Sequence, residues 1–255
     1  MAASDAKNPL DLKRFAKRAK HLHSFWVTNK ENTKIWKGAD ALCVVSGGDN
    51  ENATLNPTSA NVQRYMLGYE FPKMIMLFTE SKLIFVTTKK KGQLFQEASK
   101  YLASDAGFAI QCIEKVKDNS WHDNFELLLK EIKSSMNGQV IGNLLKETPT
   151  GKFANAWRSA LDKSGLKEEE SSTGFNLAMA VKDEDEILSM KKTALLSSKA
   201  MKKFARRMWG IIDEDNDKVK HSQLAGEIES NIDRPIPRHK TTHKIEVTCT
   251  GRVHK

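Results

Sequence analysis

The sequence has few cysteines and no long apolar run. Its three cysteines form no CxxC pair, and Cys43 and Cys112 lie in apolar, strand-like stretches. Buried free thiols are therefore the simplest interpretation of these two residues. No run approaches the ~18 apolar residues that a membrane-spanning helix requires. The N-terminal stretch MAASDAKNPLDLKRFAKRAK lacks the apolar core of a secretory signal. We therefore expect a protein that stays in a reducing compartment and does not enter a membrane.

Motifs that would indicate a catalytic centre are also missing. Gly47-Gly48 follows a predicted strand, but neither GxxxxGK(S/T) nor GxGxxG is present, so a phosphate loop is only weakly indicated. No HExxH or GxSxG motif occurs either. Because His21, His23 and His122 cannot be joined to a nucleophile by motif, we expect them to be surface or packing residues. The sequence thus indicates no catalytic residue and no cofactor site.

One cluster near the C-terminus contains the side-chain types that bind metals. It consists of His239, His243, Cys249 and His254. The four-residue spacing of its first two histidines would suit zinc if they lay on a helix. Pro235 and Pro237 upstream, and the strand-like residues 245–248, disfavour a helix there. Zinc binding is therefore a minor alternative, and we predict no metal site.

The chain is basic, with 41 Lys and Arg against 32 Asp and Glu and a formal net charge of +9. Much of the excess lies at the ends. Residues 1–37 hold nine basic and three acidic residues, and residues 233–255 hold six and two. Such an excess attracts polyanions in a salt-dependent way without selecting a particular one. A solvated surface explains both ends equally well.

The most apolar part of the chain is residues 65–88, YMLGYEFPKMIMLFTESKLIFVTT. Two apolar runs, Met74–Thr79 and Leu83–Thr88, are separated by three polar residues, which predicts a β-hairpin. Gly68 and Pro72 precede the hairpin and favour a break in the preceding helix. We expect this hairpin at the centre of a sheet.

Apolar periodicity predicts the other elements. Expected strands are 39–46, 108–116 and 139–142, and expected helices are 11–27, 57–67, 93–102, 123–135, 151–163, 183–209 and 218–232. Leu12, Phe15, Ala19, Leu22 and Trp26 form an apolar stripe on the first helix. Packing on its own domain explains this stripe more simply than membrane binding does. Asn56 is the expected N-cap of the second helix, with Pro57 at its first position. Alternating strands and helices predict an α/β fold.

The composition changes near residue 170. Residues 167–173, KEEESST, are typical of a polar loop, and we place a domain boundary at 170–176. In the long helix that follows, Asp183 and Glu186 suit the helix start, and Arg206 and Arg207 suit its last turn. Its expected buried face comprises Ile187, Met190, Ala194, Leu195, Met201 and Phe204. The methionines at 66, 74, 76, 190 and 201 are most simply core residues.

The central stretch resembles a known family. Residues 68–91, GYEFPKMIMLFTESKLIFVTTKKK, are similar to the N-terminal domain of the large subunit of FACT, a histone chaperone that reorganises nucleosomes. Four further stretches resemble that domain in the same order: ADALCVVSGG (39–48), GKFANAWRSAL (151–161), LAMAVKDEDEILSMKKTALLSSKAMKKF (177–204) and HSQLAGEIE (221–229). The resemblance covers roughly residues 10–232, and the order of the matches makes it specific.

The resemblance implies a fold of the aminopeptidase P and creatinase type without enzyme activity. Residues 1–175 would form an α/β N-lobe with a central mixed sheet covered by helices. Residues 176–255 would form the truncated start of a pita-bread C-lobe, with no metal ligands. Beyond about Ile236 the chain no longer follows the family. We therefore expect the long helix to expose apolar positions that a complete C-lobe would cover.

The resemblance also implies a function. The chain would be a component of the FACT complex, a non-enzymatic module that binds core histones and nucleosomes in transcription, DNA replication and repair. It would act in the nucleus, on the chromosome. The small HMG-type subunit of FACT would be a partner of the full-length family, through a region missing here. The alternatives are a metal-dependent aminopeptidase-like enzyme and a simple basic protein with weak, non-specific DNA binding. The sequence singles out no histone-contacting residue.

Overall fold

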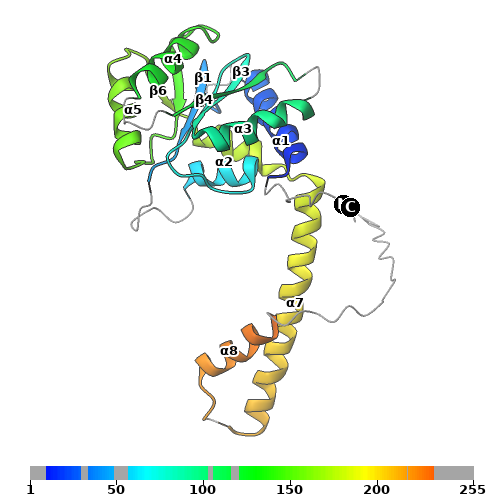
Figure 1. The fold of residues 1–255 in the computed structure, drawn as a ribbon. Helices are drawn as coiled ribbons and strands as arrows, with labels where there is room; N and C mark the ends of the chain where they lie inside the picture. The colour runs from blue at the N-terminus through cyan, green and yellow to red at the C-terminus, as the bar shows by residue number, and fades with distance from the viewer. Residues whose placement is uncertain are drawn as a thin grey trace, which may run out of the picture. The chain divides into compact units, whose positions relative to one another are not determined.

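The computed structural model describes residues 10–29, 34–48, 57–102, 106–115, 121–216 and 218–232 (Figure 1). The chain divides into two units, residues 1–181 and 182–255. The first unit is an α/β layer structure, and the described part of the second consists of two helices. The predicted boundary at 170–176 lies a few residues before the end of the first unit.

A six-stranded mixed sheet forms the centre of the first unit. Its strands are β1 (Ala41–Val45), β2 (Ile75–Phe78), β3 (Lys82–Thr87), β4 (Ala109–Glu114), β5 (Val140–Asn143) and β6 (Lys167–Glu170). The spatial order is β4-β3-β2-β1-β5-β6. Strand β2 runs antiparallel to both of its neighbours, whereas the remaining pairs are parallel. The predicted hairpin is confirmed as β2 and β3, and it lies inside the sheet.

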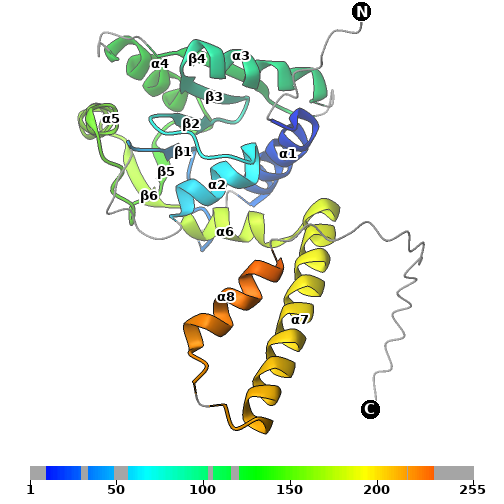
Figure 2. The same ribbon diagram turned by 60° about the horizontal axis from the view of Figure 1, so that its bottom comes forward.

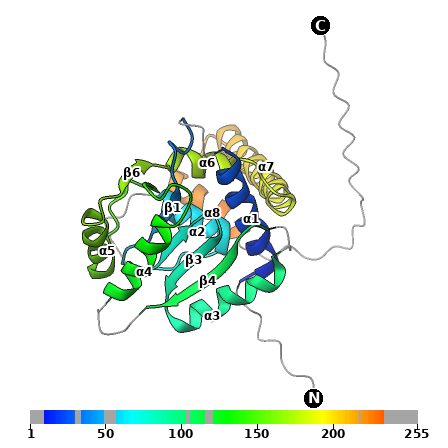
Figure 3. The ribbon, with the colours of Figure 1, turned by 90° about the horizontal axis from the view of Figure 1, so that it is seen from above.

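Helices cover both faces of this sheet. One face packs against α1 (Leu12–Asn29), α2 (Thr58–Leu67), α3 (Lys89–Glu97) and α6 (Ser172–Ala180), and the other against α4 (His122–Lys133) and α5 (Lys152–Asp162). Figure 2 shows α1 and α2 on the side of the strands opposite α5. Figure 3 shows α4 and α5 together. The predicted α/β fold with a covered central sheet is confirmed.

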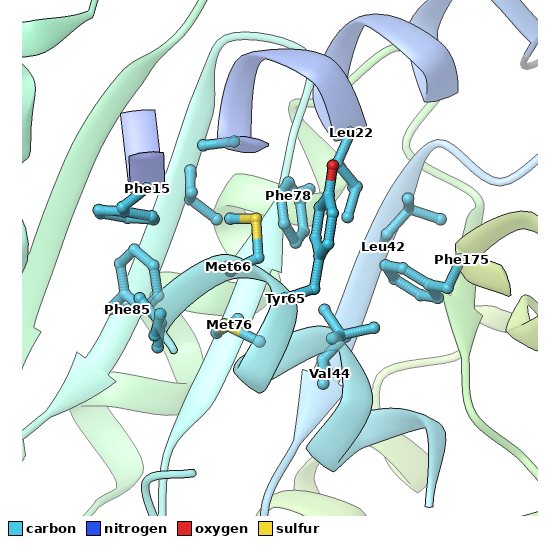
Figure 4. Close-up of a cluster of buried hydrophobic side chains, with 14 of the residues drawn as sticks. Phe15, Leu22, Leu42, Val44, Tyr65, Met66, Met76, Phe78, Phe85 and Phe175 are labelled. Carbon is cyan, nitrogen blue, oxygen red and sulfur yellow. The ribbon is translucent and has the colours of Figure 1, made fainter. Parts of the chain in front are cut away.

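The strand period of two explains why the sheet has two cores. Along β2, Met76 and Phe78 belong to the first core, whereas Ile75 and Leu77 belong to the second. All four are fully buried, because successive side chains point to opposite faces of a covered sheet. In the first core, Tyr65 and Met66 of α2 approach the strands together with aromatic and aliphatic residues of α1 (Figure 4).

The apolar stripe of helix α1 packs against the first core of the same unit. Phe15, Ala19, Leu22 and Trp26 are completely buried in the first core, and Leu12 packs against it. Packing on its own domain is therefore confirmed. Among the helices of the described ranges, none is long and apolar enough to cross a membrane.

Two predicted helix starts were wrong. Helix α2 begins at Thr58, with Pro57 in the N-cap position, and Asn56 lies outside the described residues. Helix α3 begins at Lys89 instead of Gln93 and ends at Glu97, where a 3-10 turn, Ala98–Tyr101, follows. The lysines at its start carry no apolar signal, so the apolar period becomes visible only further along the helix.

The prediction of a polar loop at 167–173 was also wrong. Lys167–Glu170 forms the edge strand β6, and α6 follows it directly. Among the described strands it pairs only with β5. Its glutamates have polar partners: Glu168 bonds Arg158 and the Asn143 amide. An edge strand with such partners needs no apolar residues, so its sequence looks like a loop.

The second unit contains α7 (Glu184–Asp213) and α8 (His221–Ile232). Asp183 caps α7, because its carboxylate accepts a hydrogen bond from the Glu186 N–H at 2.9 Å and the Glu186 carboxylate accepts one from the Asp183 N–H at 3.0 Å. The predicted capping is confirmed. The helix extends beyond Trp209, so Arg206 and Arg207 do not lie in its last turn, which contains no basic residue.

Apolar positions along α7 are exposed. No residue of the helix is buried, so the predicted buried face was wrong, and Met190 and Met201 are not core residues like Met66, Met74 and Met76. The exposed fractions reach 56% at Met190 and 64% at Met201. This agrees with the second expectation, that the long helix exposes apolar side chains.

A lysine-lined cavity as candidate functional site

A cavity of about 1000 Å³ lies at one edge of the sheet in the first unit. Its lining residues follow β1, β3 and β4, which are mutually parallel, so the carboxyl ends of these strands meet there. The starts of α3 and α5 complete the lining. Ligands of open α/β sheets bind outside the carboxyl ends of the strands. The cavity therefore occupies the position in this fold where a binding site is expected.

Lysine dominates the lining. Five lysines border the cavity: Lys73, Lys89, Lys90, Lys115 and Lys152. One carboxylate, that of Glu114, is present. No ion pair in the described part of the chain involves any of the five lysines. The cavity lining therefore carries a net positive charge.

Lys115 is the most enclosed of these cations. Its Nζ donates a hydrogen bond to the carbonyl oxygen of Lys73 at 3.3 Å and lies 4.8 Å from the centre of the Phe153 ring. Burial lowers the pKa of Lys115, and repulsion from Lys73 and Lys91 lowers this pKa further. Burial also lowers the pKa of Lys91, which contacts the Phe71 ring. The like charges are thus close enough to affect one another.

The two glycines after β1 join this strand to the loop before α5. The Gly48 N–H donates to the Thr150 carbonyl at 2.8 Å, and the Gly47 carbonyl accepts from the Lys73 N–H at 2.9 Å. A Cβ at Gly47 would lie 2.7 Å from backbone atoms of Thr150, so only glycine fits there. The Gly48 N–H therefore has a protein partner and does not point free into the cavity as a donor for a phosphate.

Two helices begin at the cavity with uncapped first turns. Thr88, the N-cap of α3, makes no side-chain cap hydrogen bond. The N-cap of α5 is Gly151, which has no side chain to offer and takes a φ of 104°. The first N–H groups of a helix have no partner within the helix, and they carry partial positive charge. Both helix starts therefore add to the positive potential of the cavity.

The histidines singled out in the sequence do not line this cavity. His21 Nε2 is 2.9 Å from the Ala178 carbonyl, and buried His23 contacts the Thr79 and Glu80 carbonyls. His122 is exposed and lies 3.2 Å from Glu126. The prediction of packing and surface roles is confirmed for these three.

The described cysteines, Cys43 and Cys112, do not belong to the cavity lining either. Cys43 is buried and Cys112 half-buried, both as free thiols, and burial raises the pKa of each to about 12. The C-terminal cluster, from His239 to His254, lies outside the described residues. Within the described ranges, no group of three or more His, Cys, Asp or Glu side chains could hold a metal ion.

Sequence reasoning considered Gly47-Gly48 only as a weakly indicated phosphate loop, and it assigned no function to the cavity lysines. The available signal was the lysine run 89–91 directly after an apolar strand, together with glycines at the ends of two other segments, Gly47-Gly48 and Gly151. Each signal is weak by itself. Only the sheet topology brings these segments to one edge.

Comparison with known proteins identifies the family. Residues 10–174 match the FACT complex subunit SPT16 N-terminal lobe domain. The chain belongs to this family. The predicted resemblance is thereby confirmed, and every residue that lines the cavity lies within the matched SPT16 lobe.

Individual relatives agree with the family match. The FACT complex subunit SPT16 of Oryza sativa subsp. japonica is 30% identical over 230 residues, which cover 89% of this chain and 21% of the relative. The solved N-terminal domain of FACT complex subunit SPT16 from Cicer arietinum has a TM-score of 0.72 at 26% identity. The match covers 87% of this chain and 50% of the Cicer chain. The corresponding domain from Eremothecium gossypii has a TM-score of 0.71 at 21% identity, with coverage of 88% and 50%. The fold is thus that of the SPT16 N-terminal domain, and the chain spans about a fifth of the curated relatives it matches.

Proposed function

We propose that this chain acts in a FACT complex as a non-enzymatic module that binds histones and chromatin. The observation that carries the proposal is the match of residues 10–174 to the SPT16 lobe family. The names of the matching relatives, FACT complex subunit SPT16, support it. The partners would be core histones and nucleosomes, with the small HMG-type subunit of FACT in the full-length family. The site of action would be chromatin in the nucleus.

A binding assay with purified core histones tests this proposal. Binding of the chain to histones is measured by fluorescence anisotropy over a salt series, with duplex DNA as competitor. Charge-driven DNA binding falls steeply with salt because it depends on counterion release. We expect histone binding to persist at salt concentrations at which DNA binding has disappeared. Binding to DNA alone, disappearing as salt rises, would contradict the proposal.

The basic cavity gives the DNA-binding alternative a specific form. If the five cavity lysines neutralised phosphates of the DNA backbone, their removal would reduce the slope of log affinity against log salt by about 0.9 for each phosphate that is no longer neutralised. If the cavity lysines have no role in histone binding, the variant without them should bind histones as tightly as the unmodified chain does, measured over the same salt series without the DNA competitor. Measuring both ligands with one protein preparation therefore separates the two functions.

A further inference from the structure

The lysine-lined cavity holds more positive charge than its own residues neutralise. Besides burial, repulsion from the lining residue Lys73 and from Lys91, which does not line the cavity, lowers the pKa of Lys115. No acidic side chain of the described ranges forms an ion pair with the cavity lysines. Like charges gathered in a partly enclosed space disfavour one another. An anion bound among them would remove this cost.

Backbone donors reach the same space. Thr88, Lys89 and Lys90 at the start of α3 line the cavity, as do Gly151–Ala154 at the start of α5. Helices of this length, nine and eleven residues, attract anions at their N-termini. Neither N-cap side chain occupies these N–H groups. Lysines and the first turns of two helices, from separate elements, therefore line one cavity.

The shape of the site favours one kind of anion. Duplex DNA presents phosphates along an extended track, whereas these lysines surround a single hollow beside the rigid Phe153 ring, which packs at 5.2 Å on Trp121. A carboxylate carries one charge. A phosphate monoester carries about −1.5 to −2 and offers three strong acceptor oxygens. It therefore matches the number and spread of the donors better.

We propose that the lysine-lined cavity binds a phosphate monoester through its lysines and the first turns of α3 and α5. This proposal does not depend on the proposed histone binding, because it is argued from the cavity lining and the histone proposal is argued from the family match. Two sources could supply the ligand: a phosphorylated side chain of a protein segment or a small phosphate ester. Both present the same group to the cavity.

Isothermal titration calorimetry with the full chain tests this site. The probes are inorganic phosphate, a phosphoserine peptide, the same peptide without phosphate, and adenosine monophosphate. We expect saturable binding of the phosphorylated probes and none of the unphosphorylated peptide. Tighter binding of the phosphopeptide than of inorganic phosphate would assign a protein source, and tighter binding of the mononucleotide a small-molecule source. Absence of saturable binding by any phosphorylated probe would overturn the proposal.

Matched variants locate the binding. Lys89→Gln combined with Lys115→Gln removes two cavity charges and should weaken binding roughly tenfold or more, because charge-assisted hydrogen bonds to phosphate are removed. Lys90→Gln with Lys152→Gln, both at exposed positions, gives a second test should the first pair perturb folding. The control, Lys13→Gln with Lys17→Gln, removes equal charge from a separate surface beside Tyr101 and should change affinity less than twofold. If the control variant weakened phosphate binding as much as the cavity variants do, the binding would be non-specific and the proposal would be overturned. The same conclusion would follow if duplex DNA displaced the phosphorylated probe equally well from the control variant and from the cavity variants.

Discussion

His23 shows how one buried side chain links distant segments of the lobe. It lies on α1, yet its Nε2 is 3.1 Å from the Thr79 carbonyl and 2.9 Å from the Glu80 carbonyl in the β2–β3 turn. Two carbonyl acceptors require Nε2 to carry the proton. The ring packs against Phe108 and Trp26. Burial lowers the pKa of His23 below its ordinary value of 6.5, more than the two carbonyl contacts raise it.

This lowered pKa predicts a pH-dependent stability. The unfolded chain binds a proton at His23 near pH 6.5, whereas the folded chain does so only at lower pH. The free energy of unfolding should therefore fall as pH is lowered from 7.5 to 5.5, mainly below pH 6.5, by at most about 1.4 kcal/mol for each pH unit over which only the unfolded chain is protonated at His23. Urea unfolding at three pH values in this window measures the slope.

Two variants isolate the contribution of His23. In His23→Gln the fall in stability between pH 7.5 and 5.5 should be smaller than in the unmodified chain, whatever the overall stability of the variant. The control is His122→Gln, which changes an exposed histidine. A slope that stays the same in His23→Gln would show that other groups cause the acid sensitivity.

At the residue scale, the sequence predicts environments better than partners. The apolar surroundings of Cys43 correctly indicated a buried thiol. The histidines were correctly assigned to packing and surface roles. The contact between His23 and Glu80, however, joins residues 57 positions apart, and no local pattern encodes that separation. The cavity lysines could not be grouped from the sequence for the same reason, because they come from segments far apart in the chain.

Helix α6 shows a close approach that depends on glycine. Gly174 lies in this helix, and a Cβ added there would be 2.3 Å from the ring of Trp36. Trp36 is completely buried and packs edge-on against Phe175 at 5.4 Å. A side chain at position 174 would therefore require the buried Trp36 ring to shift. Glycine therefore sets the distance between α6 and the first core.

We expect Gly174→Ala to destabilise the first unit. Alanine favours a helix over glycine by up to about 1 kcal/mol, but overpacking a filled core costs about 1–3 kcal/mol or more. Because the clash is with a buried ring, the packing cost should exceed the gain in helix propensity. Guanidinium unfolding followed by tryptophan fluorescence measures the difference.

A second helical glycine provides the comparison for this substitution. Gly226 lies in α8, and an added Cβ there meets nothing within 4 Å. Gly226→Ala should therefore raise the helicity of the second unit slightly, as seen by circular dichroism, without a clash. If Gly174→Ala were as stable as the unmodified chain, the packing of α6 on Trp36 would not be as tight as described.

At the element scale, apolar patterns located most strands and helices, and their failures have two physical causes. Strand β6, KEEE, is an edge strand whose side chains bond polar groups such as Arg158, so it needs no apolar residue. Helix α3 begins with lysines that face the cavity instead of the core. In both segments the side chains are charged and do not pack in the core, so hydrophobic periodicity cannot reveal the strand or the start of the helix.

At the scale of the whole molecule, topology creates the candidate site. Lys73, Lys89, Lys115 and Lys152 belong to segments well separated in the sequence, and they meet because β1, β3 and β4 run parallel and end at one edge. The sequence was sufficient to predict the α/β class and the family. It could not predict the cavity, because strand order is decided by packing between distant segments.

In the second unit, helix α7 leaves a row of apolar side chains in contact with water. Met190, Met201 and Ile212 are spaced by eleven residues, close to three helical turns, so they lie along one stripe of α7. Their exposed fractions are 56%, 64% and 65%. Soluble proteins seldom expose long apolar patches without covering them. The stripe should therefore favour association between copies of the chain.

We expect this chain to associate reversibly as its concentration rises, measured by sedimentation velocity. Met201→Lys combined with Ile212→Lys should shift it toward the monomer, because charges on the stripe oppose its burial while lysine preserves the helix. Ser189→Lys with Ser198→Lys adds the same charge at exposed polar positions of α7, and it should leave association unchanged. Equal dissociation in both variants would attribute the effect to net charge. A monomer at every concentration in the unmodified chain would show that the exposed stripe does not drive association.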